Sequence, residues 1–335
     1  MNKMDHDTSR PPQFFKGLRY NSISNYLKDH FGSKTIKLSI DGGFSCPNRD
    51  GSKAFGGCAF CSDSGSGEFS SNIDDQIELY SRKWPSAKYI GYFQNHTNTY
   101  APVSELREKY YSILKDPRVS GLAIGTRPDC LPEDVLDLLE EINKDHFLWV
   151  ELGLQTIHEA TAKNLNRCYD LEEFDRAVSE LRKRNIRTVV HLILGLPGET
   201  RDMMLESVRY VSSIPGLFGM KLHLMNLVKG SSMAHDIPEY VSFPDIDSYV
   251  ELVTECLEII PSSVTIHRLT GDARRDILIS PIWSFNKRTI LNRINDRLNL
   301  LDTWQGKRVS QKVMNLTLRV TLSFYASKRA QILEI

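Results

Sequence analysis

Short apolar segments alternate with longer amphipathic segments along most of the chain, and this alternation constrains the fold more than any other sequence feature. The apolar segments are rich in Val, Ile and Leu, as expected of parallel strands that are buried on both faces. We expect strands at Thr35–Ile40, Lys88–Phe93, Gly121–Gly125, Leu148–Gly153, Thr188–Gly195, Met220–Leu224 and Val264–Arg268. Between them we expect helices at Asp74–Lys83, Val103–Lys115, Pro132–Asn143, Leu171–Arg184, Arg201–Ser213 and Asp245–Ile260. This order predicts an α/β fold, a partial or near-complete parallel (β/α) barrel, in which the loops that follow the strands carry the chemistry.

The length of 335 residues fits one α/β barrel with extensions. We expect an N-terminal approach segment over residues 1–34, with a helix at Ser22–His30, followed by the barrel over residues 35–270. A helical C-terminal extension is expected over residues 271–335, and it ends in a basic tail after Gly306.

Charge and composition exclude several classes of protein. The chain has 42 Lys and Arg residues and 42 Asp and Glu residues, so it does not bind nucleic acid through global positive charge, although a local basic face remains open. No apolar run approaches the roughly 20 residues that span a bilayer, and the polar start of the chain is unlike a secretory signal. The 6 cysteines are too few for a disulfide scaffold in a chain of this length, which indicates a reducing compartment. We therefore expect a cytoplasmic protein without a membrane partner.

Three cysteines, Cys46, Cys58 and Cys61, follow the first predicted strand in a C-x11-C-x2-C pattern on a glycine-rich loop. Glycines let the backbone wrap closely, so the three thiolates can converge on one metal centre. Structural zinc needs four protein ligands, whereas a [4Fe–4S] cluster held by three thiolates keeps one iron open to a small molecule. Phe60, between the paired cysteines, would shield such a cluster from water. A zinc loop completed by a distant residue is the alternative.

With an aromatic residue directly before the third cysteine, this loop resembles that of the radical S-adenosylmethionine (SAM) superfamily. The gap in C-x11-C-x2-C departs from the usual C-x3-C-x2-C and is similar to that of the YhcC/YtqA-like subgroup, which is related to the Elongator catalytic subunit. The resemblance extends from about Arg19 to Gly306. Further matching segments are Tyr92–Gln94, Thr97–Tyr100, Thr126–Asp129, Glu151–Thr156, Gly195–Glu199 and His267–Asp272.

The resemblance implies two cofactors, a [4Fe–4S] cluster held by Cys46, Cys58 and Cys61 and a SAM molecule on its open iron. These cofactors would produce a deoxyadenosyl radical that takes a hydrogen atom from the substrate. The Elongator relationship implies a tRNA wobble uridine as substrate, and the subgroup implies conversion of carboxymethylaminomethyl-uridine to aminomethyl-uridine. An electron donor such as flavodoxin or ferredoxin is the implied protein partner.

Two strand ends hold candidate SAM contacts. Glu151 and Gln155 lie at the end of the fourth predicted strand, and the resemblance implies that these polar residues contact SAM. An acid inside so apolar a strand is costly to bury without a partner, which favours a functional role over a structural one. Gly195, Leu196 and Pro197 form the turn after the fifth strand, where exposed backbone groups could contact the adenine edge. This turn is also a common strand-to-helix connection.

Arg127 follows the third predicted strand and is a further candidate for cofactor binding. Its guanidinium can pair with the carboxylate of SAM or of a substrate through two parallel hydrogen bonds. A structural ion pair with Asp129 or Glu151 is the equally supported alternative. Phe60 is expected beside the cluster.

Several further side chains are candidates for contact with the substrate. Lys221 and His223 alternate on the sixth predicted strand, so both point to the same side. His267 and Arg268 are adjacent on the last strand, so at most one of them is expected to face inward. Asn95 follows the second strand and could line the substrate face, or it could simply belong to a polar loop. The histidines on the strands could instead be core residues whose hydrogen bonds are satisfied within the protein.

The remaining cysteines, Cys130, Cys168 and Cys256, are far apart and are expected to be small buried or half-buried thiols. Cys168 is also a catalytic candidate, because the YhcC/YtqA-like subgroup usually has Gly at the position after Arg167.

Basic residues recur in the C-terminal region, with aromatic residues between them. They are Arg274, Arg275, Lys287, Arg288, Arg293, Arg297, Lys307 and Arg308, interleaved with Trp283, Phe285 and Trp304. Such a stretch could follow a phosphate backbone and stack on bases, or it could be a solvated helix face. Two rival functions stay open, a radical SAM oxidase or decarboxylase of a small molecule or porphyrin, and a zinc-stabilised nucleic-acid adaptor.

Overall fold

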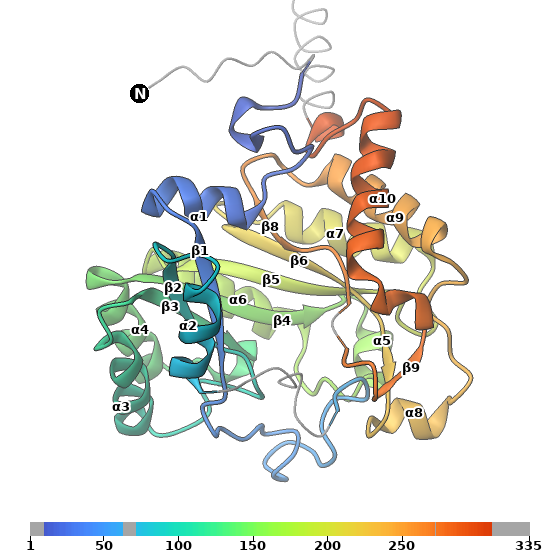
Figure 1. The fold of residues 1–335 in the computed structure, drawn as a ribbon. Coiled ribbons are helices and arrows are strands. Elements are labelled where there is room, and N and C mark those ends of the chain that lie inside the picture. The colour runs from blue at the N-terminus through green and yellow to red at the C-terminus, as the bar shows by residue number, and fades with distance from the viewer. Residues whose placement is uncertain (1–9, 63–71, 272, 310–335) are drawn as a thin grey trace, which may run out of the picture.

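The computed structural model describes residues 10–62, 72–271 and 273–309. Seven parallel strands form one sheet in the order β1-β2-β3-β4-β5-β6-β8, and the sheet curls into a half-barrel (Figure 1). The strands are β1 (Thr35–Ile40), β2 (Lys88–Phe93), β3 (Val119–Thr126), β4 (Phe147–Gln155), β5 (Arg187–Leu194), β6 (Gly219–Leu224) and β8 (Thr265–Arg268). Every neighbouring pair is parallel, so the predicted α/β partial barrel and its strands are confirmed.

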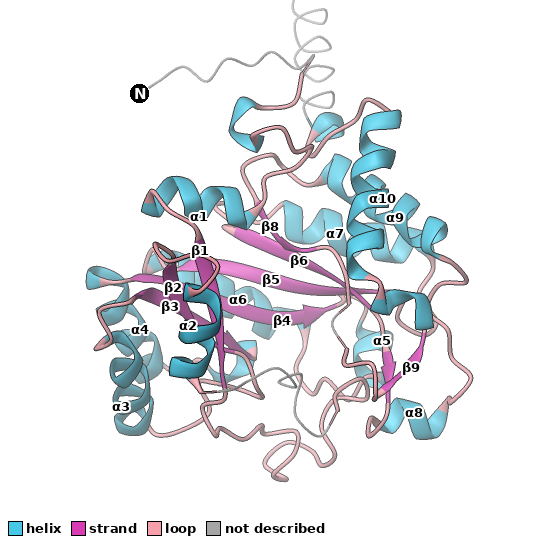
Figure 2. Ribbon diagram, viewed as in Figure 1, coloured by secondary structure: helices cyan, strands magenta, loops and turns pink. Residues whose placement is uncertain are grey.

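Helices connect these strands and flank the sheet (Figure 2). They are α1 (Ile23–Phe31), α2 (Ile73–Ser81), α3 (Val103–Leu114), α4 (Glu133–Asp145), α5 (Glu159–Asn164), α6 (Leu171–Lys183), α7 (Arg201–Ser212), α8 (Ser232–Asp236), α9 (Ile246–Ile259) and α10 (Lys287–Leu300). Two short strands, β7 (Leu227–Val228) and β9 (Leu278–Ser280), pair antiparallel beside the sheet. Each helix that the sequence predicts is present.

The outer face of the sheet packs against α3, α4, α6, α7 and α9 in the main hydrophobic core. Strand β4 shows the division between the faces, because Leu148, Val150 and Leu152 belong to this core. The alternate residues Trp149 and Glu151 lie on the inner face. A fully buried Leu or Val contributes about 1.5–3 kcal/mol, and a slip of one residue would exchange the two faces, so packing fixes the register of β4.

Helix α1 closes the amino-terminal end of the half-barrel. Leu27 of α1 packs with Phe147 and Trp149 on the inner face. The backbone N–H of Ile266 donates a hydrogen bond to the carbonyl of Asn21 over 2.7 Å, so the approach segment also covers the edge of β8. The inner face is therefore filled at this end, and its carboxyl end is where a pocket can form.

The C-terminal region is helical, as the sequence predicts. Helix α10 packs on α9 through Ile290, Ile294 and Leu298, all of which are buried. The domain boundary expected at residue 271 stays a prediction. The basic tail after Gly306 lies outside the described residues from position 310 onward. Within the described ranges, no helix combines the length and the apolar character that crossing a bilayer requires.

Candidate active site at the carboxyl ends of the strands

A pocket opens on the inner face of the half-barrel, at the carboxyl ends of the parallel strands. Its wall combines the loop after β1 with residues from β2, β4, β5, β6 and β8. The lining includes Cys46, Cys58, Phe60, Cys61, Tyr92, Gln94, Arg127, Glu151, Gln155, Tyr169, His191, Lys221, His223 and Arg268. This is the end of the sheet at which parallel barrels place their chemistry.

The cysteine loop is anchored to the connection between α5 and α6. Asn48 donates its side-chain amide to the carbonyl of Asn166 over 2.5 Å and approaches the Cys58 sulfur at 3.6 Å. The backbone N–H of Ala59 donates to the carbonyl of Leu165 over 2.9 Å. These contacts hold the loop over the pocket, and all three cysteines of the C-x11-C-x2-C pattern line it.

The electrostatic surroundings of the thiols favour metal ligation. A hydrogen bond from Cys61 lowers the pKa of Cys58 to about 7 against the effect of burial, and Arg127 adds to the lowering. The same hydrogen bond, together with burial, raises the pKa of Cys61. A thiolate is the form that binds metal, so Cys58 is poised for ligation near neutral pH.

The donor set fits an iron–sulfur cluster better than a zinc ion. The pocket lining contains three thiols, those of Cys46, Cys58 and Cys61. Structural zinc needs four ligands around one ion, whereas three thiols around a pocket suit a [4Fe–4S] cluster with one open iron.

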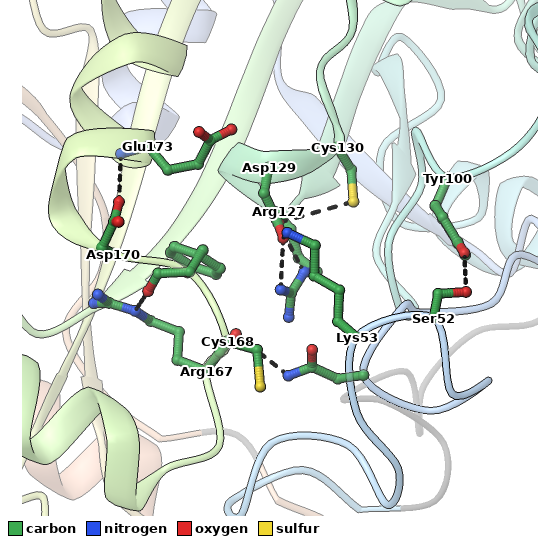
Figure 3. A network of polar contacts seen from close by, with 12 residues as sticks. Ser52, Lys53, Tyr100, Arg127, Asp129, Cys130, Arg167, Cys168, Asp170 and Glu173 are labelled. Atoms are coloured by element: carbon green, nitrogen blue, oxygen red, sulfur yellow. Dashed lines mark hydrogen bonds and ion pairs between the residues drawn. The ribbon is translucent and has the colours of Figure 1, made fainter.

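Arg127 is held by Asp129 in the turn after β3 (Figure 3). Its Nε donates to Asp129 Oδ1 over 2.9 Å and its Nη2 to Oδ2 over 2.8 Å. Lys53 pairs with the same carboxylate at 2.7 Å, and the guanidinium lies 4.9 Å from the centre of the Tyr169 ring. The structural ion pair with Asp129 is therefore present, yet Arg127 also lines the pocket and its Nη1 is buried without a partner.

Glu151 lies at the floor of the pocket and is fully buried. Its Oε1 accepts a hydrogen bond from Trp149 Nε1 over 2.9 Å. Its Oε2 accepts one from His191 Nε2 over 2.9 Å and one from the Lys221 ammonium. Burial opposes the charge on Glu151, but Lys221, Lys37 and His191 hold the pKa of this carboxyl well below its usual range. Glu151 is therefore an ionised residue whose two oxygens are already engaged within the protein.

Lys221 and His223 both line the pocket from β6, which confirms that they point to the same side. The Lys221 ammonium also donates to the Tyr92 hydroxyl over 3.0 Å. The His223 ring lies 5.0 Å from the His191 ring, and its Nε2 is buried without a partner. Burial, with Lys221 adding to it, lowers the pKa of His191 to about 4 although Glu151 acts in the opposite direction.

The expectation that only one of His267 and Arg268 faces inward is wrong. The pairing of β6 with β8 shifts between Met220 and Lys221, where a β-bulge interrupts the alternation. Arg268 lines the pocket, and the His267 ring packs against the Trp149 ring on the same inner face, 5.7 Å between centres. His267 lies below the pocket and does not line it.

Gln155 ends β4 in an unusual backbone conformation. Its φ is +66°, in the left-handed region, and the pairing with β5 shifts between Gly153 and Gln155. A Cβ on Gly153 would lie 2.5 Å from the Gln155 side chain, so the glycine makes room for that amide. The amide contacts the Tyr169 hydroxyl at 3.1 Å and faces the pocket, where the sequence predicts a cofactor contact.

The turn of Gly195, Leu196 and Pro197 does not contribute to the described lining of the pocket. The Gly195 carbonyl accepts a hydrogen bond from Tyr240 over 2.8 Å, and a Cβ at Gly195 would lie 2.6 Å from Phe243. Leu196 is buried in a separate apolar cluster. The segment before α9 therefore covers this turn, and packing accounts for its glycine.

Asn95 is buried but is not among the described residues that line the pocket, whereas its neighbours Gln94 and His96 are. The chain bends here after the end of β2, with a φ of +56° at His96, so adjacent side chains point in different directions.

Cys168 is exposed rather than buried or half-buried as the sequence predicts, whereas Cys130 and Cys256 are buried. Its φ is +61°, the left-handed conformation that glycine adopts without strain. Its sulfur lies 3.1 Å from Asn166 Oδ1 on the outside of the turn. The side chain therefore lies outside the lining of the pocket.

Sequence reasoning missed four polar side chains of the inner face, Tyr92, Gln94, His191 and Tyr169. Tyr92 and His191 extend from strands that are otherwise apolar, and Gln94 directly follows β2, so polar residues at these positions were the available signal. His191 stands directly beside Lys221 in the register of β5 and β6. A polar residue recurring on neighbouring buried strands predicts a shared polar site.

Half of the eight basic residues of the C-terminal stretch form ion pairs within the described residues, namely Arg274, Arg293, Arg297 and Arg308. Arg293 pairs with Asp247 at 2.5 Å and Arg297 with Glu251 at 3.2 Å, both between α10 and α9. Trp304 is buried and so is not available to stack on a base. This surface therefore resembles a solvent-exposed helix face that carries ion pairs.

Comparison with known proteins assigns the family. The Radical SAM superfamily matches residues 51–211, and the Radical_SAM C-terminal domain matches residues 218–299. The Bacillus subtilis protein YtqA is 47% identical over 86% of this chain and 92% of its own length. The Escherichia coli protein YhcC is 35% identical over 83% of this chain and 92% of its own length.

A solved structure shares the fold. Archaeal Elp3 from Methanocaldococcus infernus superimposes with a TM-score of 0.57 at 14% identity, covering 79% of this chain and 63% of that one. Three observations support the same family assignment. They are the half-barrel whose pocket is lined by three cysteines, the two matching domains and the sequence relatives. The chain belongs to the radical SAM superfamily and, within it, to the YhcC/YtqA-like group.

Proposed function

We propose that this chain is a radical SAM enzyme that acts on a tRNA wobble uridine and converts carboxymethylaminomethyl-uridine to aminomethyl-uridine. In this conversion the bond between nitrogen and the carboxymethyl carbon would break, water would supply the oxygen of the departing glyoxylate, and SAM would be the two-electron oxidant, leaving as methionine and deoxyadenosine. Membership of the superfamily implies its two cofactors, a [4Fe–4S] cluster and SAM. Together they supply a deoxyadenosyl radical that takes a hydrogen atom from the substrate. The observation that carries the proposal is that Cys46, Cys58 and Cys61 line one pocket with the polar inner face of the half-barrel.

The positions of several side chains in the pocket suggest their roles. Cys46, Cys58 and Cys61 are the proposed cluster ligands, and Phe60 shields the cluster from water. Arg127 offers its unpartnered Nη1 to the carboxylate of SAM, and Gln155 offers its amide from the end of β4. These contacts would hold the cofactor within the pocket at the carboxyl ends of the strands. Glu151 is not given a SAM contact, because both of its oxygens already accept hydrogen bonds.

A distant sequence relative supports this choice of substrate. The chain is 23% identical to Elongator complex protein 3 of Schizosaccharomyces pombe over 56% of its length, and this likeness is the ground for proposing a tRNA wobble uridine. The subgroup implies the carboxymethylaminomethyl side chain. An electron donor such as flavodoxin or ferredoxin would reduce the cluster, and a reducing cytoplasm suits three thiolate ligands.

Mass spectrometry of tRNA nucleosides tests the substrate. Cells that lack the gene should accumulate carboxymethylaminomethyl-uridine and lose aminomethyl-uridine with its derivatives. The gene for the wild-type chain should restore the profile, and the gene for Cys58→Ala should not. Purified, anaerobically reconstituted enzyme should convert the accumulated nucleoside in tRNA with SAM and a reductant. An unchanged nucleoside profile in the deletion strain rules out this substrate and leaves the assignment to the superfamily intact.

A second candidate is a radical SAM oxidase or decarboxylase of a small molecule. The observation in its favour is the ion-paired surface of α9 and α10, which offers little free charge to a tRNA backbone. Unchanged nucleosides, together with deoxyadenosine formation stimulated by a fraction of small metabolites, would support this candidate. Stimulation by tRNA alone would exclude it.

A further inference from the structure

The pocket floor carries more cationic side chains than anionic ones. Glu151 is the one carboxylate among the described residues that line the pocket. Lys221 and Arg268 line the same region, and Lys37 places its ammonium 4.0 Å from Glu151 Oε1. These side chains extend inward from β1, β4, β6 and β8, so the arrangement is built by the sheet and does not depend on a loop.

Lys221 is the central group of this floor. Its side chain is almost fully buried, and its ammonium donates to Glu151 and to the Tyr92 hydroxyl. An ammonium has three hydrogen-bond donors, so one donor remains for a ligand in the pocket. His223 adds a second donor position from the same strand, because its buried Nε2 has no partner among the described residues.

The depth of the floor restricts what can reach it. Lys221 lies three residues before the end of β6, roughly 10 Å along an extended strand. The rings of Trp149 and Phe147 and helix α1 close the half-barrel beneath it. A nucleic-acid backbone is too wide to reach Lys221 from the mouth of the pocket, whereas a carboxylate on a short flexible arm can reach it.

Electrostatics specify the charge of that group. Buried cations are costly to keep without compensating anions, and the Lys37 and Lys221 ammonium groups share one carboxylate, that of Glu151. An incoming carboxylate would form charge-assisted hydrogen bonds in a water-poor site, where such bonds are strongest. Burial lowers the pKa of Lys221 and the pKa of His223. An anion beside these two side chains would raise both pKa values.

We infer that the floor of the pocket is a binding subsite for a carboxylate of the substrate, held by Lys221 with His223 and Arg268 beside it. Glu151 is the internal carboxylate that competes with this ligand for the Lys221 ammonium. The inference rests on the proposed function in one respect, because the carboxymethyl group of the proposed uridine substrate supplies such a carboxylate on a short arm. The carboxylate of SAM belongs to the other end of the pocket, where Arg127 lies.

Trifluoroacetate observed by fluorine NMR is a suitable probe, because it presents a bare carboxylate and gives one resonance. With the anaerobically reconstituted enzyme, its line should broaden, and Lys221→Met should weaken its binding about tenfold. Lys88→Met is the matched control, since Lys88 is an exposed lysine at the opposite end of the sheet and should leave binding unchanged. Trifluoroethanol, which carries no charge, should not broaden with any of these proteins.

Glu151→Gln provides a test that does not depend on the folding of Lys221→Met. Removal of the internal carboxylate leaves the cations of the floor without their anion, so trifluoroacetate should bind more tightly than to the wild type. If the contacts of Glu151 with Lys221 only maintained the structure of the pocket, Glu151→Gln would weaken trifluoroacetate binding, as Lys221→Met does. Equal or weaker binding by Glu151→Gln, or equal binding by wild type and Lys221→Met, overturns the inference.

Competition separates the possible sources of the anion. The nucleoside carboxymethylaminomethyl-uridine should displace trifluoroacetate, and aminomethyl-uridine, which lacks only the carboxymethyl group, should not. Displacement by SAM or by inorganic phosphate at similar concentration would overturn the assignment to a substrate carboxylate. A probe that binds through Lys221 but is not displaced by the nucleoside upholds the subsite and contradicts the wobble-uridine substrate.

Discussion

Arg127 and Asp129 form a two-bond ion pair within a single turn, with 2.9 Å between Nε and Oδ1 and 2.8 Å between Nη2 and Oδ2. This geometry uses one edge of the guanidinium and leaves Nη1 buried without a partner among the described residues, on a side chain that lines the pocket. Asp129 is itself buried and also pairs with Lys53 (Figure 3). The acid therefore acts as a support that fixes the direction of one free donor beside the cysteine loop.

Asp129→Asn should weaken SAM binding through this support. Loss of the charge-assisted pair frees the guanidinium to rotate, and the expected cost is about tenfold in the dissociation constant of SAM. Lys53→Ala is the matched control, because it removes the more exposed partner of the same carboxylate and should change the constant by less than about twofold. Calorimetric titration of SAM into the anaerobic enzyme measures both. Equal effects of the two substitutions would show that Arg127 does not contact SAM.

Replacement of any one of Cys46, Cys58 and Cys61 by Ala should remove the cluster. Two thiolates cannot hold a [4Fe–4S] cluster that needs three, so iron and sulfide content and deoxyadenosine formation should all fall to background. Cys168→Ala is the control, since this thiol is exposed and outside the lining of the pocket. Full iron content in any one of the three variants would contradict the ligand assignment, and loss of activity in Cys168→Ala would give that thiol a role.

The strands and the cysteine site were predictable because each depends on local pattern. Parallel strands buried on both faces leave continuous apolar runs, and the cysteine spacing is visible without knowledge of the fold. The inward position of Lys221 and His223 followed from alternation along one strand. These features need no information about which strand lies beside which.

The errors occurred where pairing between strands decides the outcome. A bulge opposite Met220 and Lys221 turned both His267 and Arg268 inward, and no local signal marks it. Packing of Phe243, which is distant in sequence, against the turn at Gly195 was also not visible in the sequence, and the adenine contact expected at this turn stays a prediction. His191 was missed because its importance comes from its neighbours Glu151 and Lys221 on adjacent strands. Tertiary contacts of this kind become visible only when the strand order and register are known.

Protonation of His191 should make stability fall as the pH falls. Its pKa is lowered to about 4 by burial and by Lys221, against an ordinary value of 6.5. Between these values the unfolded chain binds a proton that the folded protein does not, so the unfolding free energy decreases by about 1.4 kcal/mol per pH unit from this group. His191→Gln should reduce the slope by about that amount in urea unfolding between pH 6 and pH 5.

His235→Gln is the control for this measurement, because His235 is exposed and should leave the slope unchanged. His223 and His267, whose pKa values burial lowers in the same direction, should account for pH dependence that remains in His191→Gln. An identical slope in His191→Gln and the wild type would mean that His191 is already protonated in the folded protein.

Substitutions of Gln155 should separate backbone strain from cofactor contact. Gln155 has φ of +66°, a conformation that costs a residue with a side chain about 1 kcal/mol relative to glycine. Gln155→Ala keeps this strain and removes the amide, whereas Gln155→Gly removes both. The Gly variant should therefore be more stable than the Ala variant by about 1 kcal/mol in urea unfolding, while both lose SAM affinity equally. Equal stability of the two variants would show that the β4 bulge relaxes, and undiminished SAM affinity would remove Gln155 from the cofactor site.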